Sequence, residues 1–463
     1  SGTLDNFSYY TFFNYKKGDG FRFNSTYDSY NFYAFLAYKL TSKLNISCEF
    51  TYLDYLAQQP GGLTDEMFYD DIFQSNRKRN WFHVNWLLYN FQASYKMSSK
   101  TNFWFNAFVL DAHRYAIGFR TNRVNQPDVN RERDVIQAEF SNFGFETKLL
   151  HEYILLNKKN FFLLGSRVYK GNNSTQQGPG SNGVDSDFII YSDIYPNYEN
   201  QSEYSNPNLN YAFFSENLIY LNDKMSLTPG LRFEYIKTES EGFYRDINTD
   251  AAGNIILNES IDTDDIRERA FLLFGLGYGF KFVDWSEFYA NCSQNYRAVT
   301  FSDINTINPS FIINPNIRDE NGYSLDFGFR GDYKKYLFYD ISTFYLSYND
   351  RIGFIQKPFI DGSVKNEKGN VGDAKIYGQE ILVNLDLNKI LSLSSHYRLG
   401  YFINFSSINS EYIESQENGV LGNEVEFVPR FNIKTGLNVG FKNFSSNFQY
   451  TFLSTQFTDA TNS

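Results

Sequence analysis

The chain contains 463 residues, with 42 Lys and Arg against 53 Asp and Glu, so its formal net charge is -11. This acidic balance, without a basic tail, argues against a nucleic-acid partner. Aromatic residues make up 19% of the chain, yet the mean hydropathy is -0.46. No stretch of about 20 consecutive apolar residues occurs, so the sequence does not encode membrane-spanning helices.

Taken in chain order, the sequence shows about 17 segments in which apolar and polar residues alternate with a period of two, the pattern of β-strands. These segments run over about 10 to 15 residues, longer than the 5 to 6 residues usual in soluble sheets. They are centred near Tyr10, Phe35, Phe50, Leu87, Phe105, Phe143, Leu163, Phe213, Phe233, Phe274, Phe288, Phe327, Phe344, Leu382, Tyr401, Leu437 and Phe448.

The connections between these segments alternate between short turns and long polar loops. The short turns include residues 97–100, 221–224, 282–285 and 332–335. Long loops are predicted at residues 58–79, 118–134, 172–206, 242–264, 300–319, 351–372 and 410–424. In an up-and-down sheet, odd and even connections lie at opposite ends. This order therefore predicts a barrel with one rim of short turns and one rim of long loops.

The two faces of each strand differ in chemistry. A charged face cannot pack into a core, because each unpaired buried charge costs several kcal/mol, so that face must meet water. A soluble sandwich would also have one polar face, but the strand length, the 37 Tyr and the 48 Phe favour a lipid-facing surface edged by aromatic girdles. The predicted fold is an all-β, transmembrane antiparallel β-barrel. We expect Leu325, Phe327, Leu437 and Val439 to face lipid, and Asp326, Arg330, Lys434 and Asn438 to face the lumen.

The number of strands predicts an incomplete barrel. Complete single-chain bacterial barrels have an even number of strands, so an odd count implies that at least one strand is missing. We therefore expect residues 1–463 to form one incomplete barrel domain. If the long loops are extracellular, an even number of strands is missing before Tyr10 and an odd number after Phe448.

Cysteine and histidine residues carry no recognisable motif. Cys48 and Cys292 stand alone within strands, and whether they pair is left open. The four histidines, His83, His113, His151 and His396, lack metal-ligand spacing.

The most specific stretch lies in the first predicted long loop. It contains Pro60-Gly61-Gly62-Leu63-Thr64-Asp65 and then Gln74-Ser75-Asn76-Arg77-Lys78-Arg79. This stretch resembles a segment of the ferric dicitrate receptors, a branch of the TonB-dependent outer-membrane receptors. Further resemblances to the wider family are Asn295-Tyr296-Arg297 with Phe301, Asn314-Pro315-Asn316, Asp319-Glu320-Asn321-Gly322, the run from Asn370 to Glu380, and Val428-Pro429-Arg430.

This resemblance implies a barrel of about 22 strands with an amino-terminal plug, of which about 17 strands and no plug are present in this sequence. It also implies a receptor in the Gram-negative outer membrane that imports a ferric chelate, with ferric citrate as the first candidate. The implied partners are the chelate, the TonB complex through the plug region, and outer-membrane lipid and lipopolysaccharide. The barrel is expected to be monomeric, to perform no enzymatic chemistry and to need no cofactor, with iron present only in the transported chelate.

Arginine residues in two neighbouring loops support an anionic ligand. The guanidinium group offers carboxylates paired donors that lysine cannot match. The best candidates for ligand binding are Arg77, Arg79, Arg120 and Arg297. Alternatively, the loop arginines pair with nearby acids such as Asp65, Asp128 and Asp134 or with lipopolysaccharide phosphates, and Arg297 pairs with Asp303.

Other functions remain open at this stage. One alternative is a receptor for another siderophore. A second is an import receptor or passive channel for a glycan, a peptide or cobalamin, in which aromatic stacking rather than arginine would dominate the vestibule. A surface adhesin or a barrel enzyme is a third class, although no distinctive Ser/His/acid spacing is present.

The order of loops and turns predicts where proteases cut intact cells. Cleavage should occur only near Pro60, Pro127, Pro179 and Pro358, at the rim of long loops. Mass spectrometry of the released peptides checks this, and cleavage near Asn222, Asp284 or Lys334 would reverse the orientation.

Overall fold

A computed structural model describes residues 1–121, 124–250, 252, 254–304, 311–358 and 364–462. The chain forms one sheet of 19 strands. The strands are β1 (Gly2–Leu4), β2 (Phe7–Gly18), β3 (Tyr27–Lys39), β4 (Leu44–Gln58), β5 (Trp81–Lys96), β6 (Thr101–Gly118), β7 (Asp134–Leu155), β8 (Lys158–Pro179), β9 (Ser202–Tyr220), β10 (Met225–Thr249), β11 (Ile255–Val283), β12 (Ser286–Arg297), β13 (Phe311–Ile313), β14 (Glu320–Tyr333), β15 (Leu337–Pro358), β16 (Val364–Asp386), β17 (Tyr397–Glu414), β18 (Phe431–Phe441) and β19 (Phe444–Leu453).

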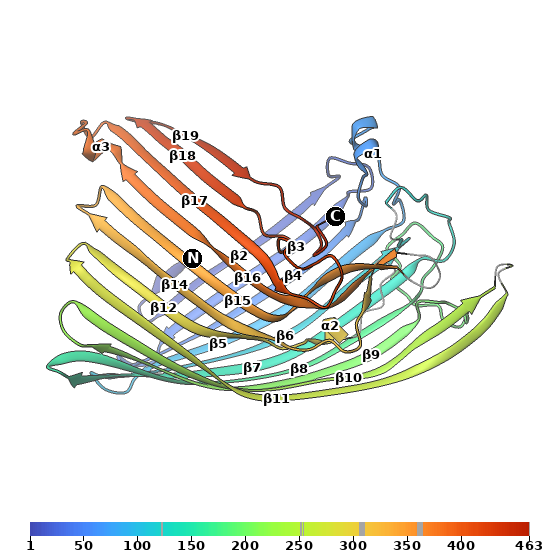
Figure 1. The fold of residues 1–463 in the computed structure, drawn as a ribbon, viewed down its shortest axis with the longest axis horizontal. Coiled ribbons are helices and arrows are strands. Elements are labelled where there is room, and N and C mark those ends of the chain that lie inside the picture. The colour runs from blue at the N-terminus through green and yellow to red at the C-terminus, as the bar shows by residue number, and fades with distance from the viewer. Residues whose placement is uncertain (122–123, 251, 253, 305–310, 359–363, 463) are drawn as a thin grey trace.

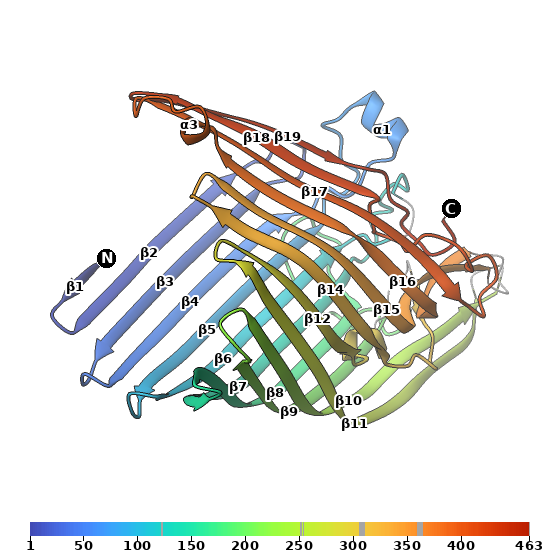
Figure 2. The ribbon, with the colours of Figure 1, turned by 60° about the vertical axis from the view of Figure 1, so that its left-hand side comes forward.

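The strands form an antiparallel meander that curves into the wall of a barrel (Figures 1 and 2). Each strand pairs with the next along the chain, except that β12 pairs with β14 and the short β13 pairs in parallel with β16. Short turns such as 97–100 and 221–224 lie at one rim, and loops 59–80, 119–133, 180–201 and 415–430 lie at the other. The predicted separation of short turns from long loops is confirmed.

The positions of the strands agree with the sequence. All 17 predicted centres lie within strands, and only the three-residue strands β1 and β13 were not predicted. The transmembrane antiparallel barrel is therefore confirmed, with β13 as a parallel exception to the all-antiparallel prediction.

Several predicted loops are instead extensions of strands. Residues 242–264 form most of a hairpin, because β10 and β11 pair from Gly242 with Thr263 to Thr249 with Ile255. In the same way, β15 and β16 pair from Arg351 with Gly372 to Pro358 with Val364. Strand β10 has 25 residues and strand β11 has 29, more than the 10 to 15 residues predicted for each strand. Backbone pairing needs no apolar side chains, so a polar composition did not end the strands.

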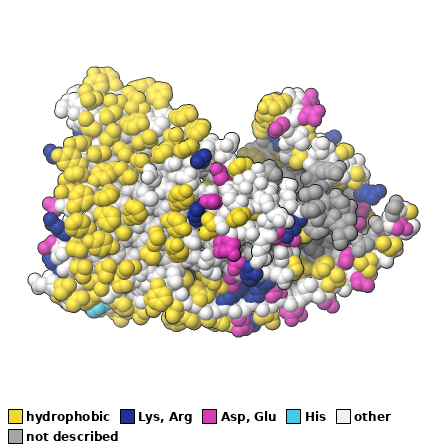
Figure 3. Space-filling view, viewed as in Figure 1, with side chains coloured by type: hydrophobic (Ala, Val, Ile, Leu, Met, Phe, Trp, Pro, Cys, Tyr) yellow, Lys and Arg dark blue, Asp and Glu magenta, His cyan; other side chains and the backbone are white. Residues whose placement is uncertain are grey.

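The two faces of the wall follow the predicted alternation. On β14, Leu325 and Phe327 are exposed, whereas Asp326 accepts hydrogen bonds from the Asn291 amide on the neighbouring strand. Asn438 lines a hollow on the opposite, polar face of β18. Figure 3 shows hydrophobic side chains in a broad band over the half of the wall nearer the short turns, with most charged side chains of this view toward the long loops.

Three short helices lie outside the sheet. They are α1 (Asp65–Asp70), α2 (Phe301–Ile304) and α3 (Leu387–Ile390). Within the described residues, no helix has the length and apolar character that crossing a membrane requires.

The exposed apolar band predicts that charge is tolerated on one face only. Replacing Phe327 by Arg should destabilise the folded barrel by about 2–4 kcal/mol if this position lies near the middle of the bilayer. Replacing Asn438 by Arg, on the lumen side, should cost much less because water solvates that face. Urea unfolding of the barrel in lipid vesicles measures both variants, and equal costs would contradict the assignment of the two faces.

Candidate functional site

The rim of long loops brings together the arginine residues that the sequence singled out. Arg77 and Arg79 lie on the loop between β4 and β5, Arg120 lies on the loop between β6 and β7, and Arg297 ends β12. The surroundings of these four side chains differ, and the differences decide which guanidinium groups face solvent.

Arg79 holds two loops together. Its Nε donates to Asp128 Oδ2 at 2.7 Å and its Nη2 donates to Asp128 Oδ1 at 2.5 Å. Its Nη1 donates to the carbonyl oxygens of Arg131 and Asn182. Only 3% of Arg79 is exposed, so its guanidinium is committed to partners within the protein.

Arg133 extends this network to a third loop. The residue is fully buried, and it donates to the carbonyl oxygens of Ser181 at 2.9 Å, Arg79 at 3.0 Å and Asp185 at 2.6 Å. Residues 59–80, 119–121, 124–133 and 180–201 therefore form one connected unit, which we call the first loop block. Buried guanidinium groups can stabilise it because their donors are paired.

The Pro-Gly-Gly-Leu-Thr-Asp motif has a structural role in the same block. Gly61 has a φ of +77°, and a Cβ atom there would lie 2.7 Å from Arg77 Cγ, so glycine is required twice over. Thr64 caps α1 by accepting a hydrogen bond from the Met67 amide. The motif therefore shapes the loop and packs it against Arg77.

Arg77 is also largely buried, with 7% exposed. Its Nη1 donates to the Gln126 carbonyl at 3.0 Å, and its guanidinium lies 5.2 Å from the centre of the Phe119 ring. These contacts connect the loop after β4 to the loop after β6.

Arg120 is more accessible, since 27% of its side chain is exposed. Its Nη1 lies 3.4 Å from Asp134 Oδ2, at the start of β7. Asp134 is buried and also accepts hydrogen bonds from Gln177 and Tyr198. Asp134 therefore keeps two other donors if Arg120 turns toward another partner.

Arg297 is the most exposed of the four, with 43% of its side chain accessible. Its Nη2 lies 3.3 Å from Asp303 Oδ1 and its Nη1 lies 3.6 Å from Glu320 Oε2. The contact with Asp303, which the sequence offered as the alternative to ligand binding, is therefore present. Asp303 is itself buried and lies 2.5 Å from Lys368 Nζ, so its charge does not depend on Arg297 alone.

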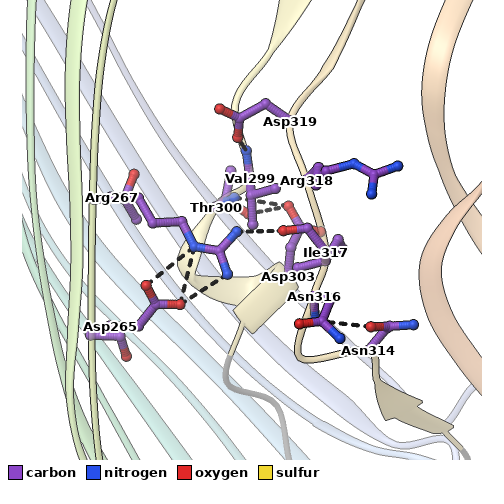
Figure 4. A network of polar contacts seen from close by, with 12 residues as sticks. Asp265, Arg267, Val299, Thr300, Asp303, Asn314, Asn316, Ile317, Arg318 and Asp319 are labelled. Atoms are coloured by element: carbon purple, nitrogen blue, oxygen red, sulfur yellow. Dashed lines mark hydrogen bonds and ion pairs between the residues drawn. The ribbon is translucent and has the colours of Figure 1, made fainter.

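A second group of polar contacts fixes the loop that follows Arg297 (Figure 4). Asp319 accepts two hydrogen bonds from Arg269, at 2.7 and 2.8 Å, and one from the Val299 amide. Arg267 contacts Asp265 and donates to the Ile317 carbonyl at 2.6 Å. We call residues 298–304 and 311–319 with these partners the second loop block.

The structure thus divides the four predicted ligand residues into two buried and two accessible ones. It also shows two important residues that were not among the four, Arg133 and Arg269. Arg269 had a detectable signal, because Asp265, Arg267 and Arg269 recur at every second residue of β11 and share its less exposed face. No local sequence signal shows that Arg133 is buried by a loop nearly 50 residues away.

Away from the loop rim, the described residues offer a cavity and two cysteine thiols. A cavity of 720 Å³ opens on the lumen side near the short turns, where Lys335, Lys389 and Arg398 lie with Asp332 and Asp386. Over the described residues, no group of three or more His, Cys, Asp or Glu side chains is placed to hold a metal ion. Both described cysteines, Cys48 and Cys292, are free thiols.

The first loop block should loosen in acid. Burial alone would raise the pKa of Asp128, but hydrogen bonds from Arg79 and the Asn130 amide, with the charges of Arg79 and Arg77, hold that pKa below its ordinary value. The ion pair therefore stabilises the block fully above the ordinary Asp pKa of about 3.9, and this contribution is lost as the pH falls through the lowered pKa.

Hydrogen–deuterium exchange of the described amides in loops 59–80, 119–133 and 180–201, corrected for intrinsic pH dependence, checks this prediction. Exchange should rise in acid in the parent, whereas Asp128→Asn should exchange fast already at neutral pH and respond less to acid. The same slow exchange in both proteins at every pH would show that the pair does not hold the loops.

The chain is similar to a known protein family and to several solved structures. The family model described as "TonB dependent receptor-like, beta-barrel" matches residues 1–463. A search of curated proteins gave no significant match. Among solved structures, the chain is similar to the unliganded ferric citrate transporter FecA, with 17% identity and a TM-score of 0.77, over 100% of this chain and 63% of that one.

The chain is also similar to the ferric yersiniabactin uptake receptor FyuA from Yersinia pestis, with 13% identity and a TM-score of 0.73, over 100% of this chain and 66% of that one. The likeness to the copper transporter OprC has 13% identity and a TM-score of 0.73, over 98% of this chain and 66% of that one. This chain spans less than two thirds of the ferric citrate transporter. At these identities the likenesses show the fold alone, whereas the match to the family model covers the whole chain. The chain belongs to the TonB-dependent receptor β-barrel family.

Proposed function

We propose that this barrel is part of a Gram-negative outer-membrane receptor that imports a ferric chelate with energy from TonB, and that ferric citrate is the first candidate ligand. Arg120 and Arg297 carry the proposal, because each has a partly exposed side chain at the rim of long loops. The likeness to a ferric citrate transporter supports the same ligand class.

The chemistry of the proposed site is binding without covalent change. A ferric citrate complex presents several carboxylates and excess negative charge, and a guanidinium group binds a carboxylate through two parallel hydrogen bonds. Each such bond, once partly shielded from water, contributes about 1.5–3 kcal/mol. Arg120 and Arg297 each have acidic neighbours, so the chelate would compete for guanidinium groups already held in position.

Arg77 and Arg79 then support the site rather than meet the ligand directly. Their guanidinium groups are buried and contact loop carbonyls or Asp128. They would hold the first loop block in place beside Arg120.

The proposal keeps the remaining partners of the family. TonB would act through a plug region, and lipid and lipopolysaccharide would surround a single barrel. The likeness to receptors named for ferric yersiniabactin and copper keeps other metal complexes open as ligands. A neutral glycan or cobalamin would need no exposed arginine, so those ligands serve as negative comparisons.

Arginine-to-lysine variants test the ligand class. Arg120→Lys and Arg297→Lys should each weaken ferric citrate binding roughly tenfold, because the charge remains but the two-pronged geometry is lost. Arg318→Lys is the matched control, since Arg318 is exposed and pairs with Asp350 across the loop surface, where such pairs contribute little.

Binding is measured by titration of the full-length receptor at fixed salt. Tight binding of a neutral glycan or cobalamin with no detectable binding of ferric citrate would reject the citrate assignment. A loss in Arg318→Lys equal to that in the other two variants would show that the effect reports overall charge.

A further inference from the structure

An apolar hollow lies on the outward face of the wall, away from the loops and the lumen. It has a volume of 310 Å³, and its outward-facing lining residues come from four adjacent strands. They are Ala34 and Leu36 on β3, Cys48 and Phe50 on β4, Tyr89 and Phe91 on β5, and Ala107 and Val109 on β6. We call this hollow the β3–β6 groove.

The register of the strands shows how the groove is built. One row across the sheet runs Leu36, Cys48, Phe91 and Ala107, and the next row runs Ala34, Phe50, Tyr89 and Val109. The centres of the Phe50 and Tyr89 rings are 5.1 Å apart, so these two side chains form one wall. The short side chains of Ala34, Cys48 and Ala107 leave the space between the larger ones.

The groove lies within the part of the wall that meets hydrocarbon. On β6 the outward residues are Phe103, Phe105, Ala107 and Val109, and the next two toward the long loops are Asp111 and His113. With about 6.7 Å between alternate residues, the four apolar positions cover roughly 20 Å of strand, a length that fits inside an apolar band of about 25 Å. Ala107 and Val109 are therefore inside the band.

The chemistry of the lining selects the occupant. Water would find almost no hydrogen-bond partner there, and an empty hollow would forfeit dispersion contacts along its walls. The volume suits about ten groups of the size of a water molecule, comparable to a stretch of methylene groups. A second copy of the barrel meeting this face about a two-fold axis would place one hollow against another and leave the space unfilled.

We propose that the β3–β6 groove binds one acyl chain of a membrane lipid and holds it longer than lipids elsewhere around the barrel. The chain would lie against Cys48, between Phe50 and Tyr89 on one side and Leu36 and Phe91 on the other. Residence there follows from contact with side chains on several sides of the acyl chain. The site needs no particular headgroup.

Photo-crosslinking tests the site. The full-length receptor is reconstituted in phosphatidylcholine vesicles that contain a phosphatidylcholine with a diazirine on its acyl chain, and the adducts are mapped by mass spectrometry. Adducts on β3–β6 should exceed those around Cys292 severalfold, because the groove holds the acyl chain. Cys292 is a suitable reference position, since it is also a free, exposed thiol and its strand neighbours Leu276 and Leu325 belong to the apolar band.

Two variants and one control complete the test. Ala107→Phe and, separately, Cys48→Leu fill the groove with apolar groups and should remove most of the excess labelling. Ala290→Phe makes a matched change on the outward face of β12 and should leave the labelling of β3–β6 unchanged. Urea unfolding in lipid vesicles shows that each variant is folded, so the outcome of this test does not depend on the proposed ligand.

A second measurement uses the two native thiols. Alkylation of Cys48 by a membrane-soluble maleimide should slow severalfold relative to Cys292 when long-chain lipid replaces a short-chain detergent. Uniform labelling around the barrel, with equal changes at both thiols, would overturn the proposal. Protein–protein crosslinks through β3–β6 in place of lipid adducts would assign the groove to a second copy and overturn it equally.

Discussion

The constraint on which this structure depends is that every backbone amide and carbonyl within hydrocarbon needs a partner in the protein. A meander of paired strands satisfies it, since each strand from β2 to β12 pairs with its neighbours along the chain. Pairing then fixes the two faces of every strand, so apolar residues such as Phe327 meet lipid while Asp326 meets the lumen. The outward-facing lining of the groove on β3–β6 is one consequence of this alternation.

At the rim of long loops, contacts between side chains hold the loops together. The described loops and the strand ends beside them bury two apolar clusters, one around Val371 and one around Val299, and guanidinium groups connect the loops as well. Arg79 and Arg133 bridge three loops in the first block, and Arg269 anchors Asp319 in the second. Such pairs are costly to break because the remaining charge is left buried, so the loops hold a defined shape around more exposed arginines such as Arg297.

Much of the fold could be predicted from the sequence because a period of two is a local property. Every predicted centre lies within a strand, only the three-residue β1 and β13 were missed, and the separation of turns from loops was found. Strand ends were missed where polar residues continue the ladder, as in residues 242–264, because hydrophobicity marks the membrane and not the sheet. The four candidate arginines were found by charge and motif, but their burial depends on loops distant in sequence, which no local pattern reports.

The long hairpin of β10 and β11 has a consequence for how such a surface can change over time. At about 3.3 Å per residue, the 29 residues of β11 extend roughly 95 Å along the strand, well beyond the hydrocarbon. Its backbone ladder supplies the rigidity, so side chains such as Glu241 and Asp264 on the exposed part can be exchanged without loss of pairing. Selection by phages or antibodies can therefore change the side chains on the exposed part of this hairpin, while the barrel keeps its architecture.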